Sequence, residues 1–345
     1  METGTLQRSR SAEPGERDIV DHLVEQFDTY PREVVVNYYT ALKTTRFVIL
    51  AGPREADKES LAEGLARALV GYPSLQWSPV RAHAWWTSQT GSPRQMAEAH
   101  ARFRTLKLHD FIEAASTSEM LELPFSFFAS IKHMSPAEVV CYFEDLPRGR
   151  FWHADGSAVP IDLPTNLFIT GTLNAEQDEM PDLSPEVHRY ATVIRLNPDH
   201  CPPAPRPNGR SRAKLDWQQT FITSGTRSGE EARAKLARLL PDGCVPLAPL
   251  NELARLLGAS RFSSSTYEKT WLYLANAFED QGDGLFLHAP MENLAIAQDY
   301  AMAQIVIPAV QSRWASTPWM EETVTDYLAP RLPRSYTQWS TSNAN

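Results

Sequence analysis

The sequence predicts an α/β protein in which helices cover both faces of a parallel sheet, followed by a second unit made only of helices. Two observations support this prediction. Four short apolar runs alternate with helix-periodic segments, namely RFVILAG (46–52), FSFFASI (125–131), NLFITGTLN (166–174) and ATVIRL (191–196). From residue 229 onward the apolar spacing is helical in every long segment. Buried parallel strands read as continuous apolar runs, whereas amphipathic helices repeat every three to four residues.

Composition divides the chain into five parts. Residues 1–17 are polar and contain Gly and Pro, and they are expected to form a disordered tail. The α/β core should occupy residues 18–196. A Pro-rich linker is expected at 197–228, because five prolines fall within its first half. The helical unit should span 229–330, and the polar end 331–345 should be frayed.

The bulk numbers exclude several classes of protein. With 345 residues, 42% hydrophobic and 22% charged, the chain can bury a sizeable core. A net charge of −9 disfavours a surface that neutralises nucleic-acid phosphates over its whole extent, so we expect any nucleic acid to be reached through a complex. Three widely spaced cysteines form neither a disulfide framework nor a zinc pattern. No apolar run reaches the roughly 18 residues of a membrane span, and we expect a cytoplasmic protein with no membrane contact.

The first apolar run leads into a segment that looks like a phosphate-binding loop. In VILAGPREADKESLAEGLA (48–66), Gly52 and Lys58 have the spacing of the pattern GxxxxGK[ST]. Asp57 stands where the second Gly would be, and it adds a negative charge where an anionic ligand would approach. Two unit charges about 4 Å apart interact by roughly 4 kcal/mol at an effective dielectric near 20. Glu59 replaces the hydroxyl residue that would hold magnesium, and it cannot simply substitute for Ser or Thr.

Four segments together resemble the McrB-like branch of the AAA+ P-loop nucleotidases. They are GPxxxxK (52–58), PFSFFASIKHMSPAEVVCYFED (124–145), LPTNLFITGTLN (163–174) and LSPEVHRYATVI (183–194). The resemblance implies a three-layer αβα P-loop (AAA+) core, an all-helical lid domain, and ring assembly with nucleotide held between neighbours. Proteins of this branch are the nucleotide-driven motors of modification-dependent restriction and related defence systems.

The same resemblance shows where this chain departs from the family. An Asp–Glu pair that serves magnesium and the attacking water falls on Lys132 and His133. His133 is a candidate general base, with a structural or partner-facing histidine as the alternative. Asn174 matches the polar residue that senses the terminal phosphate, although an ordinary Asn at a strand end is an equal alternative. The expected residual nucleotide site therefore comprises Gly52, Pro53, Lys58 and Asn174.

The family's two arginines are also displaced. The resemblance implies an arginine finger at the position of Tyr190, and Arg189 lies one residue early. The basic residue implied at the start of a lid helix falls on Ser264 and Ser265. Both positions weaken the case for hydrolysis.

The loop hydroxyl and the strand Asp of an active enzyme are bridged by magnesium, and here these positions carry Glu59 and Lys132. We expect a direct ion pair between them, with Asp57 as a second acceptor. The three charges would block the nucleotide site. Loss of one partner of a buried pair costs roughly 3–5 kcal/mol, so replacing Lys132 should destabilise the protein without any nucleotide.

Three interpretations of the function follow. In the first, the chain is an AAA+-derived pseudo-nucleotidase, a structural or regulatory subunit of a homo- or hetero-oligomeric defence or DNA-processing complex. In the second, it is an active ATP- or GTP-hydrolysing motor completed by a neighbouring subunit. In the third, ATP or GTP is a static ligand, bound without Mg²⁺ by Lys58 and Asn174. No metal site is expected, and no motif for nucleophilic catalysis is present.

Overall fold

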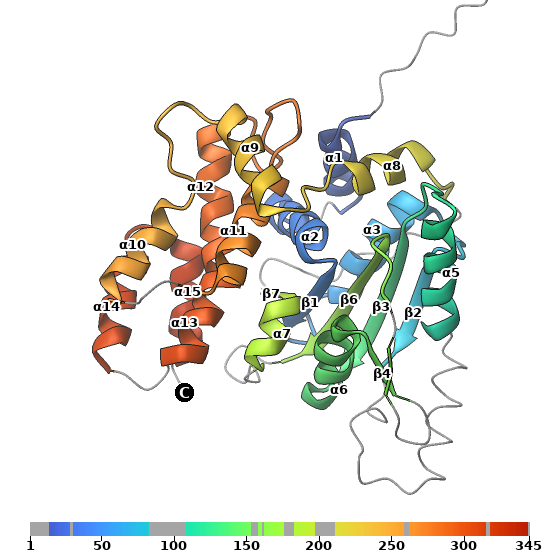
Figure 1. Ribbon diagram of the computed structural model, residues 1–345, viewed down its shortest axis with the longest axis horizontal. Coiled ribbons are helices and arrows are strands. Elements are labelled where there is room, and N and C mark those ends of the chain that lie inside the picture. The colour runs from blue at the N-terminus through green and yellow to red at the C-terminus, as the bar shows by residue number, and fades with distance from the viewer. Residues whose placement is uncertain are drawn as a thin grey trace, which may run out of the picture.

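A computed structural model describes residues 14–27, 30–82, 108–152, 158–160, 162–175, 183–196, 211–258, 262–314 and 318–343. It contains a five-stranded sheet flanked by helices and, beside it, a unit built from helices alone (Figure 1). The predicted α/β class is therefore confirmed at this level. Among the described residues, no helix is long and apolar enough to cross a membrane.

The sheet is parallel throughout. Its strands lie in the order β2-β3-β6-β1-β7, so the first strand of the chain sits between the last two. The strand bounds are β1 (Phe47–Gly52), β2 (Trp77–Arg81), β3 (Phe127–Met134), β6 (Leu167–Asn174) and β7 (Thr192–Arg195). In such sheets, ligands bind beyond the carboxyl ends of the strands, where the connections diverge. The segment after β1 occupies that position.

Alternation along β1 divides its side chains between the two faces of the sheet. Val48 and Leu50 join the apolar cluster that includes α1, α2, α3 and α8, whereas Ile49 and Ala51 join the cluster with α5, α6 and α7. The helix bounds are α1 (Glu16–Gln26), α2 (Arg32–Thr45), α3 (Lys58–Val70), α5 (Leu108–Met120), α6 (Pro136–Val140), α7 (Pro185–Tyr190) and α8 (Leu215–Thr223). All four residues are fully buried, which gives the core three layers.

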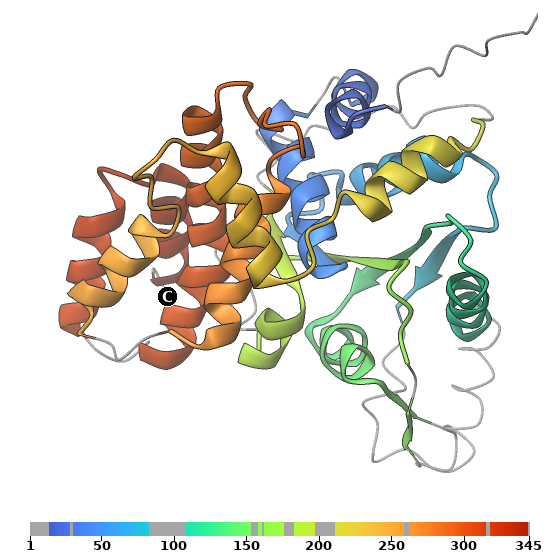
Figure 2. The same cartoon turned by 45° about the horizontal axis from the view of Figure 1, so that its top comes forward.

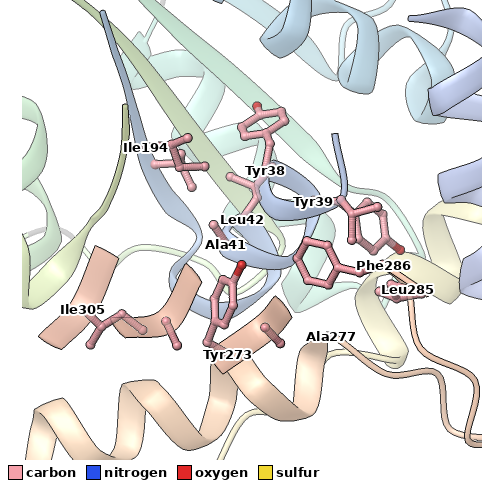
Figure 3. Close-up of a cluster of buried hydrophobic side chains, with 14 of the residues drawn as sticks. Tyr38, Tyr39, Ala41, Leu42, Ile194, Tyr273, Ala277, Leu285, Phe286 and Ile305 are labelled. Atoms are coloured by element: carbon pink, nitrogen blue, oxygen red, sulfur yellow. The ribbon is translucent and has the colours of Figure 1, made fainter. Parts of the chain in front are cut away.

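The C-terminal helical unit packs against α2 and β7. Figure 3 shows the ring of Tyr273 directed from this unit toward α2, and its phenol donates to Asn37 Oδ1 at 2.6 Å. The unit comprises α9 (Gly229–Leu239), α10 (Ala248–Leu256), α11 (Ser264–Asn276), α12 (Pro290–Ala301), α13 (Ile307–Trp314), α14 (Pro318–Leu328) and α15 (Pro333–Asn343), with a π-helical turn, η5 (Met302–Val306), before α13. One continuous apolar cluster includes both units, so they form a shared core.

Two of the predicted parts contain helices that the sequence pattern does not predict. The expected linker at 197–228 contains helix α8, which lies alongside α3 (Figure 2). Its Phe221 is buried against the sheet, and its buried Gln218 accepts from the Ser126 N–H at 3.1 Å. The expected frayed end at 331–345 contains helix α15, whose Trp339 is 5% exposed. The Pro-rich residues 197–210 lie outside the described ranges, and the short helix α8 that follows them is not predicted from the sequence.

The tail prediction is also two residues too long, because α1 begins at Glu16. Residues 1–13 lie outside the described ranges. Buried Glu16 accepts from the ammonium of Lys43 and the phenol of Tyr39. Glu16 thus belongs to the core although the sequence around it is polar, because its two partners lie on the buried helix α2.

Candidate functional site: the loop between β1 and α3

The loop begins at Gly52, the last residue of β1. A Cβ atom built on this residue would lie 2.4 Å from the carbonyl oxygen of Leu196, which is closer than atoms can approach. Only glycine allows this close contact between the two chain segments. Gly52 also pairs in register with Asn174 at the end of β6, and the Ala175 N–H donates to the Gly52 carbonyl at 3.0 Å. The structure therefore brings Asn174, which is exposed, to the base of the loop.

Lys58 is turned back onto its own loop. Its ammonium is buried and donates to three loop carbonyls: Gly52 at 2.9 Å, Pro53 at 2.5 Å and Ala56 at 3.3 Å. An ammonium has three N–H donors, so these acceptors match its capacity. A phosphate would have to compete with bonds that are already formed.

Asp57 caps helix α3. Its carboxylate accepts from the backbone N–H of Ser60 at 3.2 Å and from the Ser60 hydroxyl at 2.6 Å. The N-terminus of a helix attracts anions through its free N–H groups and its dipole. Here a side chain of the protein supplies that anion. The phenol of Tyr30 donates to the Asp57 carbonyl at 2.5 Å and fixes the backbone of the cap.

Glu59 faces two basic side chains of β3. Its Oε2 lies 2.9 Å from the ammonium of Lys132, and its Oε1 lies 3.0 Å from Nε2 of His133. The expected ion pair between Glu59 and Lys132 is therefore present. Both side chains are about one-fifth exposed, at 18% and 22%, so the pair is half-buried. Glu59 Oε1 is sealed from solvent and accepts no aligned hydrogen bond among the described residues, although His133 Nε2 lies 3.0 Å away.

A β-bulge explains how consecutive residues reach the same carboxylate. The pairing of β3 with β6 shifts between Ile131 and Met134, and His133 has a φ of 56°. Regular strands send neighbouring side chains to opposite faces, and a bulge with a left-handed residue breaks this rule. The His133 N–H, released from the ladder, donates to the Thr172 hydroxyl at 3.0 Å.

The expected role of Asp57 as a second acceptor for Lys132 is wrong. Its two carboxylate oxygens are occupied by Ser60, because a residue directly before a helix is placed to cap it. Asp57 therefore blocks the helix end rather than neutralising Lys132. His133 is 64% exposed and adjacent to Glu59, and this position alone assigns it no catalytic role.

The remaining predicted positions lie elsewhere. Arg189 and Tyr190 end helix α7, and Arg189 lies 3.8 Å from Glu186 of the same helix. Ser264 and Ser265 begin α11, and together with Arg189 they line a cavity between α7 and α11. Sequence reasoning missed this cavity, since its walls come from both units. Among the described residues, no three His, Cys, Asp or Glu side chains are grouped to hold a metal ion.

Comparisons with known proteins do not assign this chain to a family. No family model matches the chain, and a search of curated proteins gives no match. Among solved structures, the chain is similar to a protein of Cytophaga hutchinsonii ATCC 33406 described as "a putative ATPase". The likeness covers 89% of this chain and 94% of that one, at 10% sequence identity and a TM-score of 0.40.

Proposed function

We propose that this chain is an AAA+-derived pseudo-nucleotidase of the McrB-like type, which serves as a structural or regulatory subunit of a multi-protein complex. The observation that carries the proposal is that the charged side chains of the loop already bond to other groups of the protein. Lys58 donates to three loop carbonyls, Asp57 occupies the helix end, and Glu59 is paired with Lys132. These three side chains, which stand at positions that would face a phosphate or a metal, are each engaged by the protein itself.

Loss of metal chemistry follows from the charges. Magnesium is held by oxygen ligands, and the strand position that would supply a carboxylate carries the cation Lys132. A cation beside the metal position repels the metal, and its partner Glu59 is withdrawn from metal binding by the same ion pair. Hydrolysis that depends on magnesium should therefore be absent or very weak.

Without hydrolysis, such a module acts through binding. The motif order of the sequence favours a place in a ring or a mixed assembly of a defence or DNA-processing system. We expect the partners to be proteins, in a homo- or hetero-oligomer, with nucleic acid reached through the complex. The neighbouring genes would identify these partners, because motors of this branch are usually encoded beside their effectors.

The test is nucleotide binding with and without magnesium. Thermal unfolding is followed with 1 mM ATP or GTP plus Mg²⁺, and with the same nucleotides plus EDTA. We expect no shift of the melting temperature for the unaltered protein. A ligand at 100 times its Kd would stabilise the folded state by about 2.7 kcal/mol, a shift of several degrees. The triple variant D57G/E59T/K132D should gain a magnesium-dependent shift, and E55T serves as the control at an exposed loop position.

Two outcomes would decide against the proposal or refine it. A clear magnesium-dependent shift in the unaltered protein would favour the active motor completed by a neighbouring subunit, and would overturn the pseudo-nucleotidase. An equal shift in EDTA, lost in K58A, would retain the absence of hydrolysis and identify ATP or GTP as a static ligand near Lys58 and Asn174.

A further inference from the structure

A cavity of about 600 Å³ lies between helix α7 of the core and helices α11 and α13 of the C-terminal unit. This volume is within the range of pockets that bind small molecules. Lys269 of α11 joins its two walls, since its buried ammonium donates to the carbonyls of His188 at 2.9 Å and Ala191 at 2.6 Å. These carbonyls belong to the C-terminal end of α7, so Lys269 holds α7 and α11 together beside the cavity.

The start of α11 presents hydrogen-bond donors to the cavity. Ser263 caps the helix by accepting from the Thr266 N–H at 3.1 Å. The preceding amides of Ser264 and Ser265, and their hydroxyls, have no acceptor among the described residues. Free N–H groups at the first turn of a helix attract negative charge.

His188 adds a donor from the opposite wall. Burial, together with the charges of Lys269 and Arg195, lowers its pKa to about 3, so the ring is neutral at neutral pH. Its Nδ1 is sealed from solvent and has no partner among the described residues. A proton on Nδ1 would be buried without an acceptor, so we assign the single proton of this cavity-lining residue to Nε2.

The charged side chains in the lining favour an anionic ligand over a cationic one. Among the described residues that line the cavity, none is acidic, although the chain has a net charge of −9. Arg189 is 58% exposed and lies 3.8 Å from Glu186, whose closer partner is Arg148 at 2.7 Å. The Arg189 guanidinium is thus only loosely held. The remaining wall is apolar and includes Phe262, Ile305 and Pro308.

We propose that this cavity binds a small organic anion, with a phosphate or carboxylate group held by Arg189, His188 Nε2–H and the first turn of α11. Its apolar body packs against Phe262, Ile305 and Pro308. No residue of the loop 52–58 lines the cavity, so this site is separate from the nucleotide position considered above. A ligand that contacts both α7 and α11 would strengthen the junction between the two units.

The experiment is calorimetric titration of the full chain with defined probes. Phenyl phosphate and benzoate represent the two head groups, inorganic phosphate lacks the apolar body, and benzyl alcohol lacks the charge. We expect saturable binding of at least one organic anion, with inorganic phosphate and benzyl alcohol at least about tenfold weaker. R189Q should weaken binding about tenfold or more, since a charge-assisted hydrogen bond is lost. S265L, which removes a donor and fills space, should abolish it.

R255Q is the matched control, because it removes the same charge from an exposed position of α10 outside the cavity. Each variant is first shown to unfold at the urea midpoint of the unaltered protein. Absence of saturable binding of both organic anions would overturn the proposal, as would binding unchanged in both R189Q and S265L. If benzyl alcohol binds as tightly as the organic anions, the head group does not contribute to binding and the proposed anion site is also overturned. Displacement of the anion by ATP, lost in K58A, would assign the cavity to the nucleotide position and overturn its independence.

Discussion

Replacing Lys132 with methionine tests the ion pair that closes the loop. The change keeps the length of the side chain and removes its charge, so Glu59 loses the ammonium at 2.9 Å. What remains is His133, whose Nε2 lies 3.0 Å from Oε1. The protein should lose stability in the absence of any nucleotide, because the carboxylate is left half-buried with one neighbour instead of two.

The magnitude follows from the distance and the exposure. Two unit charges at 2.9 Å interact by roughly 1.4 kcal/mol at the dielectric of water and by about 6 kcal/mol at an effective dielectric near 20. Desolvation and ordering of the side chains offset much of this attraction. Since each side chain is about one-fifth exposed, we expect a loss of about 1.5–3 kcal/mol. This is below the roughly 3–5 kcal/mol of a fully buried pair.

The assay is a double-mutant cycle with K132M, E59Q and the combined variant, measured by urea unfolding. A direct pair predicts a coupling energy of about 1 kcal/mol or more. The coupling should fall only slightly in high salt, because half-buried pairs are screened less than exposed ones. A urea midpoint for K132M equal to that of the unaltered protein, or a coupling below about 0.3 kcal/mol, would refute the reasoning.

Three further predictions concern other parts of the fold. The pKa of His188 is lowered from 6.5 to about 3, so as the pH falls below 6.5 this residue binds a proton in the unfolded chain but not in the folded protein. Between pH 7.5 and 5.5, the free energy of unfolding of the unaltered protein should therefore fall by about 1.4 kcal/mol more than that of H188Q. Urea unfolding that gives the same pH dependence for both proteins would contradict this. Q218L removes the acceptor of Ser126 N–H and the donor to Leu69 O, and should cost about 2–3 kcal/mol in thermal unfolding, whereas Q219L on the exposed side of α8 should cost almost nothing. W339A should lower the free energy of unfolding by about 3–5 kcal/mol, since the Trp339 indole is buried and donates to Thr325 at 3.1 Å. An unchanged melting temperature would show that α15 does not contribute to the stability of the core.

Sequence reasoning predicts well what depends on local pattern. Continuous apolar runs identified β1, β3, β6 and β7, because a strand covered on both faces must be apolar on both sides. It missed β2 at the edge of the sheet, where WSPVR has one fully buried side chain, Val80. An edge strand needs only one buried position, so its pattern does not stand out from a loop.

The charges of the candidate site were predicted in part. The pairing of Glu59 with Lys132 follows from two motif positions that meet in space, and it could be proposed from spacing and resemblance. The inclusion of His133 could not, since consecutive strand residues should point apart and only the bulge turns both toward α3. Helix capping by Asp57 could have been read from the sequence, because Asp is a favoured residue directly before a first helical turn.

The closure of the loop rests on three groups of contacts that belong to different elements. Lys58 is held by the loop, Asp57 by the first turn of α3, and Glu59 by β3. A single reversion therefore leaves two obstacles: E59T frees the hydroxyl position, but it leaves Lys132 as an unpaired cation at the metal position and Asp57 on the helix end. Removing Asp57 alone exposes the helix end, but it keeps the cation. We expect D57G, E59T and K132D to restore little nucleotide binding one at a time, and the triple variant to restore more than the sum of the three. Full nucleotide binding after one substitution would show that the other two groups of contacts do not contribute to the proposed closure of the site.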